Sequence, residues 1–203
     1  MKQQMFWEST FGADYVDRNA SPELFAANLA FFAQVISRNQ LKISSVLELG
    51  ANIGMNFKAL KALLPEVELT GVEINPKAYS KLREIADHAV NSSIEEFEPK
   101  ESCDLVLTKG VLIHLSPESL SNTYLKISKA SKRWVLLAEY FSRDPMSIPY
   151  RGHKDVLFKR DFCSEFLDVN SDDNWELRDY GFVSRHDIFP QDDINWYLLE
   201  RAK

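Results

Sequence analysis

An acidic residue and two glycines lie close together where a short apolar run ends. Glu48 stands two residues before Gly50, and Gly54 follows four residues after it. Glycine at such a turn lets the backbone approach a ligand, and a second glycine lets the following helix pack close to the strand. Because a pyrophosphate is usually cradled by three glycines, this pair favours contact with an uncharged nucleoside group and disfavours a nicotinamide dinucleotide.

A second carboxylate follows at the end of the next apolar run. Glu73 lies near the end of residues 68–74, 23 positions after Gly50. A carboxylate at this position can accept hydrogen bonds from both hydroxyls of a ribose. The alternative for Glu48 and Glu73 is that each is a strand-end charge facing solvent. We expect both to lie at the ligand-binding edge, because ligands bind at the carboxyl ends of strands in open parallel sheets.

Apolar runs and helical periodicities alternate along the chain. Residues 22–39 have helical spacing, with Ser21 as N-cap and Pro22 in the first turn. Further helices are predicted over 55–64, 76–87, 117–130 and 159–167, and strands over 45–49, 68–74, 88–92, 104–111, 133–140, 175–183 and 194–200. Tandem strand–helix units imply a parallel sheet. The sequence therefore predicts an α/β fold, with a doubly wound, Rossmann-like, seven-stranded, mostly parallel sheet, an antiparallel C-terminal hairpin and helices on both faces.

The amino-acid composition limits the classes of partner that the protein is expected to bind. The 203 residues are 45% hydrophobic, which suffices for one core, and the net charge of -6 with dispersed Lys and Arg disfavours nucleic acid. No apolar stretch is long enough to span a bilayer. Two cysteines, Cys103 and Cys163, without a secretory segment at the start predict neither a disulfide framework nor a metal site. We expect a cytoplasmic protein that acts on a small molecule, as a monomer or weak homodimer, without nucleic-acid or membrane partners.

Three stretches at predicted strand ends carry a family resemblance. VLELGANIG, GVEINPKA and DLVLTKGVLIHLSPE resemble the successive motifs of class I methyltransferases that use S-adenosylmethionine (SAM). Together with FWESTFGADYVDRN, IPYRGHKDVLFKRDF and DYGFVSRHDIFPQDDINWYLLE, they resemble the pseudaminic acid biosynthesis-associated methylase family over nearly the whole chain. The resemblance implies SAM as cofactor and S-adenosylhomocysteine (SAH) as product.

The resemblance also implies roles for individual residues. The predicted contacts to the methionine and ribose side of SAM come from the first turn, namely Gly50, Ala51, Asn52 and Gly54, with Glu73 on the ribose hydroxyls and Ile74 against adenine. Backbone contacts to the methionine moiety are implied for the residues after the fourth strand, Lys109, Gly110 and Leu112. The side chain of Lys109 has the alternative of a solvated charge.

One position departs from the family pattern. Many relatives carry an aspartate for the adenine amino group after the third strand, whereas this chain has Ser92, Ser93 and Ile94 there. A hydroxyl or backbone group would therefore have to serve, and Ser93 and Ile94 are the expected contacts.

Aromatic and charged residues are concentrated near the N-terminus. Tyr15 and Arg18 share a face if this stretch is helical, and Arg18 would then pair with the SAM carboxylate or, alternatively, with a nearby aspartate. The aromatic side chains of the same stretch are Phe6, Trp7, Phe11 and Tyr15. They predict either a lid that excludes water from the sulfonium or ordinary core packing.

Methyl transfer to an OH or NH group needs positioning and a base. His114 follows the fourth strand, and an ordinary histidine pKa near ~6.5 suits proton removal. The alternative is a structural histidine that orients a loop through its ring N–H. His153 is a second candidate base, and Glu139 and Tyr140 end the fifth strand, where we expect them to face the acceptor. For Glu139 the alternative is that it caps the preceding packing.

A cationic stretch follows the fifth strand. Tyr150, Arg151 and Lys154 lie in a long loop, where Arg151 can clamp a carboxylate or phosphate and Lys154 and Arg160 add charge. This composition predicts an anionic acceptor, and the alternative is a solvated loop.

The predicted organisation is a single domain over 1–203. It would comprise an N-terminal helical cap (1–40), a SAM-binding core (41–141), a substrate loop and helix (142–170) and the terminal hairpin (171–203). The favoured function is O- or N-methylation of a small polar, anionic metabolite, such as a nonulosonic-acid-type sugar or its precursor. The alternatives are a non-catalytic SAM- or nucleotide-binding regulatory module of a sugar pathway and an NAD-dependent enzyme.

Overall fold

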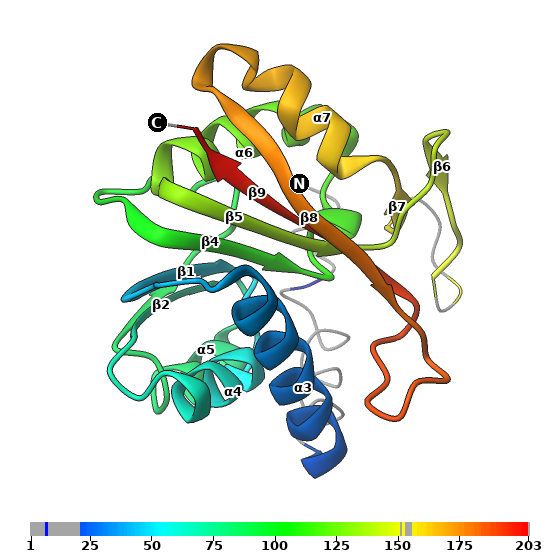
Figure 1. Ribbon diagram of the computed structural model, residues 1–203. Helices are drawn as coiled ribbons and strands as arrows, with labels where there is room; N and C mark the ends of the chain where they lie inside the picture. Colours follow the sequence, from blue (N-terminus) through cyan, green and yellow to red (C-terminus); the bar gives the residue numbers. More distant parts are fainter. Residues whose placement is uncertain (1–6, 8–20, 151, 153–155, 203) are drawn as a thin grey trace. The chain divides into compact units, whose positions relative to one another are not determined.

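The computed structural model describes residues 7, 21–150, 152 and 156–202 (Figure 1). Its main strands are β1 (Ser45–Leu49), β2 (Glu68–Glu73), β3 (His88–Asn91), β4 (Cys103–Lys109), β5 (Ser131–Glu139), β8 (Trp175–Val183) and β9 (Ile194–Arg201). They form a seven-stranded sheet in the order β3-β2-β1-β4-β5-β9-β8. The β1–β2, β2–β3 and β4–β5 pairs are parallel, and β9 is antiparallel to both β5 and β8. The predicted fold class is therefore confirmed.

Of the five described α-helices, three begin at a residue whose side chain caps the first turn, and two begin without such a cap. The five helices are α3 (Pro22–Asn39), α4 (Met55–Leu63), α5 (Pro76–Leu82), α6 (Pro117–Ala130) and α7 (Phe162–Val169), with 3-10 turns η1 (Leu112–His114) and η2 (Ser171–Asp173). Ser21 Oγ accepts from the backbone N–H of Leu24 at 3.1 Å, as the N-cap prediction requires. The predicted continuation of α5 to Asp87 is wrong, because the Asp87 carboxylate instead accepts from the backbone N–H of Leu69 at 2.8 Å and anchors β2.

The chain divides into two compact units. Unit 1 comprises residues 1–97 and 184–192, and unit 2 comprises 98–183 and 193–203. In unit 1, α3 packs against α4 (Figure 1). Segment 184–192 is tied to α3 by a buried hydrogen bond, 3.0 Å long, from Gln191 Nε2 to Asn28 Oδ1.

A glycine in β2 lets the helices of unit 1 pack close to the strand. A Cβ on Gly71 would lie 2.9 Å from Leu82 Cδ2 and 3.0 Å from Phe57 Cε2, so α4 and α5 can approach β2 only because this position has no side chain. We expected this role at Gly54, but the neighbours of a Cβ there would be Leu82 and Ile85 instead. The close approach that Gly54 permits is therefore to α5 and the turn after it.

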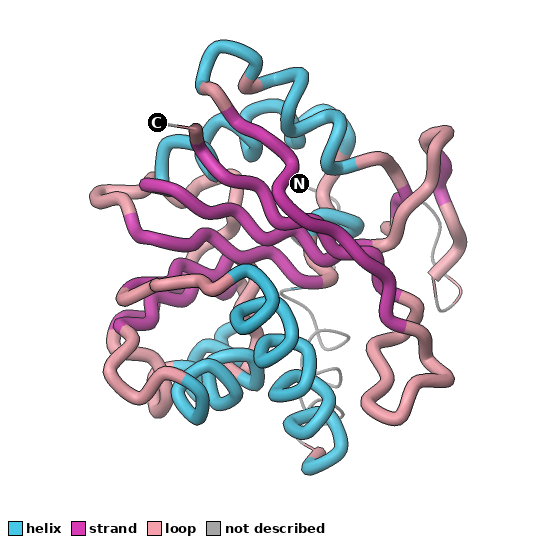
Figure 2. The backbone as a smooth tube through the Cα atoms, viewed as in Figure 1, coloured by secondary structure: helices cyan, strands magenta, loops and turns pink. Residues whose placement is uncertain are grey.

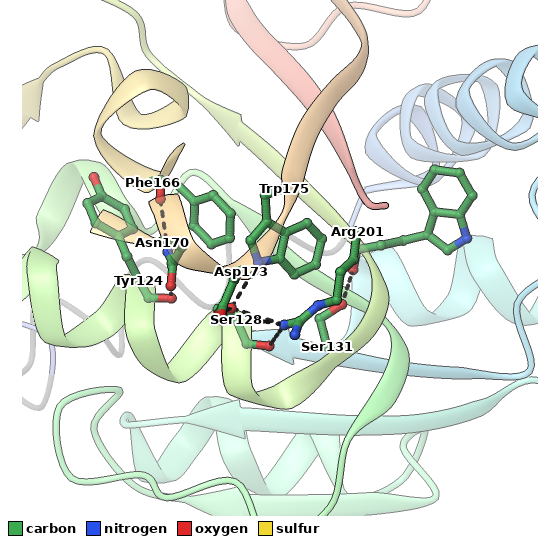
Figure 3. A network of polar contacts seen from close by, with 9 residues as sticks. Tyr124, Ser128, Ser131, Phe166, Asn170, Asp173, Trp175 and Arg201 are labelled. Atoms are coloured by element: carbon green, nitrogen blue, oxygen red, sulfur yellow. Dashed lines mark hydrogen bonds and ion pairs between the residues drawn. The ribbon is translucent and has the colours of Figure 1, made fainter. Parts of the chain in front are cut away.

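In unit 2, α6 and α7 pack on each other and on β5. Figure 3 shows a polar network that joins these helices to β8 and β9. Ser128 Oγ accepts from Trp175 Nε1 at 2.9 Å and from Arg201 Nη2 at 3.0 Å, and it donates to Asp173. The Arg201 guanidinium also lies over the Trp175 ring at 4.7 Å. The network lies where β8 begins and β9 ends, so it fixes the C-terminal strand pair.

The segment after β5 contains a short strand pair that the sequence did not predict. β6 (Met146–Ser147) pairs antiparallel with β7 (Phe158–Lys159), separate from the long strands of the unit (Figure 2). Strands of two residues are too short to show an alternating pattern. Helix α7 accordingly begins after Asp161, whose Oδ1 accepts from the backbone N–H of Ser164 at 3.0 Å, rather than at Lys159.

None of the helices in the described parts of the chain is both long and apolar enough to cross a membrane.

Candidate functional site

The turn between β1 and α4 is tied to the end of β2. Gly50 and Ala51 donate their backbone N–H groups to the carbonyl of Val72, at 2.9 and 3.0 Å. Gly50, Asn52 and Gly54 all have positive φ angles, of 74°, 48° and 77°. Asparagine tolerates this left-handed conformation better than most residues with a side chain. The turn is therefore fixed by its own residue types and by β2.

Glu73 holds this turn from the carboxyl end of β2. Its Oε2 accepts from the backbone N–H of Asn52 at 2.8 Å, and its Oε1 accepts from the backbone N–H of Asn75 at 2.7 Å. Burial raises the pKa of Glu73, and the backbone hydrogen bonds from Asn75 and Asn52 oppose that shift. Because each carboxylate oxygen can accept two hydrogen bonds, the two amides leave capacity for ribose hydroxyls.

Neither strand-end acid faces solvent. Glu48 is 1% exposed and Glu73 is 8% exposed, so the alternative interpretation of solvated charges is wrong for both. The side-chain amide of Asn56, in the first turn of α4, donates to Glu48 Oε1. Glu48 therefore orients Asn56, a residue that the sequence analysis did not single out.

Two side-chain amide oxygens near this turn lack a hydrogen-bond donor within the described residues. Asn52 Oδ1 and Asn56 Oδ1 are buried, and neither accepts a hydrogen bond within the described residues. A buried acceptor without a donor costs about 1 to 3 kcal/mol. A hydrogen-bond donor from a ligand, such as an ammonium group, would remove this cost at an oxygen that it reaches, which is compatible with the amino-acid end of SAM.

The residues after β2 and β3 lie in the same unit. Asn91 Nδ2 donates to the carbonyls of Glu73 and Ile74, at 2.8 and 3.1 Å, and so joins the two strand ends. Ser93 and Ile94 are buried, and Ser93 Oγ accepts from the backbone N–H of Glu96 at 3.1 Å. The hydroxyl keeps its O–H donor and a second lone pair, so Ser93 and the neighbouring backbone groups stay the predicted contacts to adenine.

Exchanging Gly54 for alanine is expected to destabilise the fold by about 1 to 3 kcal/mol. The new Cβ would meet Leu82 Cδ1 at 3.2 Å, and φ at this position is +77°. Gly110 is the matched control, since its φ is +65° but nothing lies within 4 Å of a Cβ there. Chemical denaturation should show a larger loss for Gly54→Ala than for Gly110→Ala, and equal losses would mean that the contacts at Gly54 carry no energy.

In unit 2, the carboxylate of Glu139 holds the segment that follows β4. It is 1% exposed, and it accepts from the backbone N–H groups of Val111 and Leu112 at 3.2 Å each and of Ile113 at 3.5 Å. Burial raises the pKa of Glu139 to about 7. Glu139 thus positions η1, and its direct contact with an acceptor stays a prediction.

Gly110 makes the turn that leads into η1. Its backbone N–H donates to the carbonyl of Ala138 at 2.9 Å, beside the β4–β5 pair. Lys109 ends β4 opposite Ala138, and Leu112 is buried. These placements are compatible with the implied backbone contacts of Lys109, Gly110 and Leu112, which stay predictions.

His114 is buried beside Tyr150. Its Nδ1 lies 2.7 Å from the carbonyl of Val156, and its ring centroid is 5.5 Å from that of Tyr150. Because a carbonyl can only accept, Nδ1 carries the proton and Nε2 carries the lone pair. Burial lowers the pKa of His114 to about 4, so the expectation of an ordinary pKa is wrong. The structure therefore gives His114 the loop-orienting contact of the alternative interpretation, with Nε2 as its basic atom.

The ring of His114 is expected to stay neutral at any pH above about 5. The physical reason is desolvation of the imidazolium, which outweighs the hydrogen bond to Val156. An NMR titration of the histidine C2 protons should show one resonance with a midpoint near pH 4, absent in His114→Gln. A midpoint near 6.5 for His114 would contradict the buried geometry.

Cations near the fifth strand are arranged differently from the prediction. Arg160 Nε pairs with Glu165 Oε1 at 2.7 Å, and Tyr124 Oη donates to Glu165 Oε2 at 2.9 Å. The charge of Arg160 is thus compensated within the unit, contrary to its expected contribution to an anion site. Lys159, which we did not predict, places its ammonium over the ring of Tyr140 at 5.2 Å.

Several predicted residues lie outside the described part of the chain. They are Tyr15, Arg18, Arg151, His153 and Lys154, together with Phe6 and Phe11 of the aromatic stretch. In the part that is described, no group of three or more His, Cys, Asp or Glu side chains is placed to hold a metal ion.

Comparison with known proteins finds structures that are similar in fold at low sequence identity. No protein-family model and no curated protein matches the chain. Magnesium protoporphyrin IX methyltransferase from Synechocystis PCC 6803, solved with bound SAH, is 12% identical, with a TM-score of 0.70 over 98% of this chain and 97% of that one. The plantazolicin methyltransferase BpumL, in complex with SAH, is 10% identical, with a TM-score of 0.70 over 99% and 94%.

A sugar-modifying protein is also among the similar structures. The sugar N-methyltransferase KedS8 from Streptoalloteichus sp ATCC 53650 is 11% identical, with a TM-score of 0.68 over 94% of this chain and 93% of that one. The likeness extends over nearly the full length of every chain compared. The chain therefore has the fold of these methyltransferases.

Proposed function

We propose that this protein is a SAM-dependent methyltransferase that transfers a methyl group to an oxygen or nitrogen of a small polar, anionic metabolite, such as a nonulosonic-acid-type sugar or its precursor. The observation that carries the proposal is the turn after β1. Glu73 holds it by the N–H of Asn52, and the turn presents two buried amide oxygens that lack donors within the described residues. The fold is shared with methyltransferases solved with SAH.

The residues of unit 1 would bind the cofactor by complementary hydrogen bonding. The remaining lone pairs of Glu73 would accept from the ribose hydroxyls, and the amide oxygens of Asn52 and Asn56 would accept from the ammonium group. SAM supplies a methyl group on a positively charged sulfur. Catalysis then depends mainly on holding the acceptor in line with that group.

His114 in unit 2 is the candidate that would collect the acceptor proton. With a pKa of about 4 its Nε2 is a weak base. A hydroxyl oxygen that takes the methyl group from sulfur becomes strongly acidic, so a weak base suffices to accept its proton late in the transfer, while SAH leaves. A neutral amine acceptor needs no such base, because its product is a stable ammonium ion. The acceptor would be bound by Tyr140, Tyr150, Arg151 and Lys154, and His153 would be the alternative base. The ammonium of Lys159 at the ring of Tyr140 favours an anionic acceptor.

The proposal is tested in two steps with the purified full chain. Isothermal titration with SAH should show binding at micromolar strength, unaffected by Lys58→Ala, which changes an exposed residue of α4. Incubation with SAM and a panel of anionic sugars, amino sugars and simple carboxylates, followed by mass spectrometry, should then find one acceptor that gains a methyl group. Absence of SAH binding would overturn the cofactor assignment.

A non-catalytic SAM-binding module is the second candidate. This candidate is favoured by the burial of His114 and by the hydrogen bond between its ring and the carbonyl of Val156, because both suit a structural role. This candidate predicts that SAH binds but that no acceptor in the panel is methylated. Methylation of any acceptor that is abolished by Glu73→Ala would exclude it.

A further inference from the structure

Asn75 connects three parts of unit 1. Its backbone N–H donates to Glu73 Oε1 at 2.7 Å, and its side-chain oxygen accepts from the N–H groups of Lys77 and Ala78, at 3.0 and 3.2 Å, which caps α5. Its side-chain nitrogen donates to the backbone carbonyl of Trp7 at 2.9 Å. Ser, Thr and Asp cap helices as well as Asn does, so the cap does not require this nitrogen. The nitrogen serves to hold Trp7.

Trp7 is thereby held beside the acid that would bind the ribose. The Trp7 carbonyl and the Glu73 carboxylate hydrogen-bond to the same residue, and that residue is 4% exposed. The indole nitrogen of Trp7 is buried while the residue as a whole is half-buried, so the protein covers part of the residue and leaves part of it exposed. The three other tryptophans, Trp134, Trp175 and Trp196, belong to unit 2.

We infer that Trp7 is a further residue of the adenosine side of the cofactor site, with Asn75 as the positioning residue that holds it there. The ligand class is a purine nucleoside, because an aromatic side chain offers a base a face or edge to pack on. The inference rests on the proposed function, since it takes an adenosyl ligand at Glu73 as given. It gives Trp7 a third role, distinct from both the lid over the sulfonium and the core packing that the sequence left open.

The effect on affinity follows from the strength of such contacts. Stacking of a base on an aromatic side chain is worth about 1 to 3 kcal/mol by alanine substitution, and 1.4 kcal/mol corresponds to a factor of ten. Trp7→Ala should therefore weaken binding of SAH about tenfold or more, and Trp7→Phe should weaken it less. The same factor should apply to 5′-methylthioadenosine, which keeps the nucleoside but lacks the amino-acid group.

The role of Asn75 is tested by a double-mutant cycle. Asn75→Ser keeps a capping oxygen and adds no charge, but it removes the nitrogen that reaches the Trp7 carbonyl. It should weaken SAH binding several-fold in the wild-type chain and have no effect in a Trp7→Ala background, because Asn75 acts through the indole. Tyr79→Ala is the matched aromatic control, since the Tyr79 ring on α5 faces Arg83 at 5.8 Å, and it should leave the affinity unchanged.

Calorimetry with SAH and with 5′-methylthioadenosine separates the outcomes, and thermal unfolding of each variant identifies loss of fold. Wild-type affinity in Trp7→Ala would overturn the inference and leave the proposed function standing. A loss with SAH but not with 5′-methylthioadenosine would also overturn it, because the contact would then not be to the nucleoside. Failure of the wild-type protein to bind either compound would overturn both. If Trp7→Ala unfolds, the affinities of Trp7→Phe and Asn75→Ser for SAH test the inference instead. Wild-type affinity in both of these variants would overturn it.

Discussion

Replacing Glu73 with alanine is expected to weaken SAH binding by at least about 100-fold. Two ribose hydroxyls that donate to a carboxylate lose about 1.5 to 3 kcal/mol each when the acceptor is removed, and 1.4 kcal/mol is a factor of ten. The substitution also frees the backbone N–H groups of Asn52 and Asn75, which the carboxylate holds at 2.8 and 2.7 Å. Isothermal titration with SAH measures the change.

Two further variants show whether the effect belongs to the site. Glu73→Gln puts an NH2 group against one of the two backbone donors, so it should also weaken binding strongly despite its similar shape. Glu68→Ala, at the exposed start of the same strand, removes only a surface contact with His88 and should bind SAH as the wild-type chain does. Unaltered affinity in Glu73→Ala would show that this carboxylate does not contact the ligand.

The buried carboxylate of Glu139 is expected to make stability depend on pH by up to about 3 kcal/mol. Burial raises its pKa from 4.5 to about 7, so between these pH values the folded chain binds a proton that the unfolded chain does not. The free energy of unfolding therefore has its full contribution from Glu139 below pH 4.5 and loses it as the pH rises to about 7. Glu139→Gln keeps an acceptor oxygen for the amides of η1 and should remove this pH dependence.

His114 contributes in the opposite direction, so the comparison must use a difference between variants. Its pKa of about 4 means that the unfolded chain binds the extra proton between pH 4 and 6.5, and stability from this group rises with pH. Urea denaturation of the wild-type chain and of Glu139→Gln is measured at pH 5 and pH 8. The contribution of His114 is the same in both chains, so it cancels in the difference between their free energies of unfolding. On going from pH 8 to pH 5, the free energy of unfolding of the wild-type chain should rise relative to that of Glu139→Gln. A constant difference would mean that Glu139 titrates normally.

The helices and strands were predictable where the signal is local. The predicted bounds of α3, β1 and β8 match the structure to the residue, because periodicity and caps such as Ser21 are read from neighbouring positions. Local signals failed where a side chain serves a distant partner. Asp87 lies outside the helix that we predicted for it, and its carboxylate accepts a hydrogen bond from the N–H of Leu69. The two-residue strands β6 and β7 are defined only by their pairing with each other.

The sequence by itself determined the α/β fold and the positions of Glu48 and Glu73 at strand ends, because the alternation of strands and helices and the turn chemistry follow from periodicity and residue type. Only the tertiary structure decided what these side chains hold. Glu73 reaches a backbone amide 21 residues away, Asn75 reaches Trp7 68 residues away, and Glu139 reaches η1 across 26 to 28 residues. Such contacts, and the pKa shifts of Glu139 and His114, arise from burial, which depends on how distant segments pack and leaves no pattern in the local sequence.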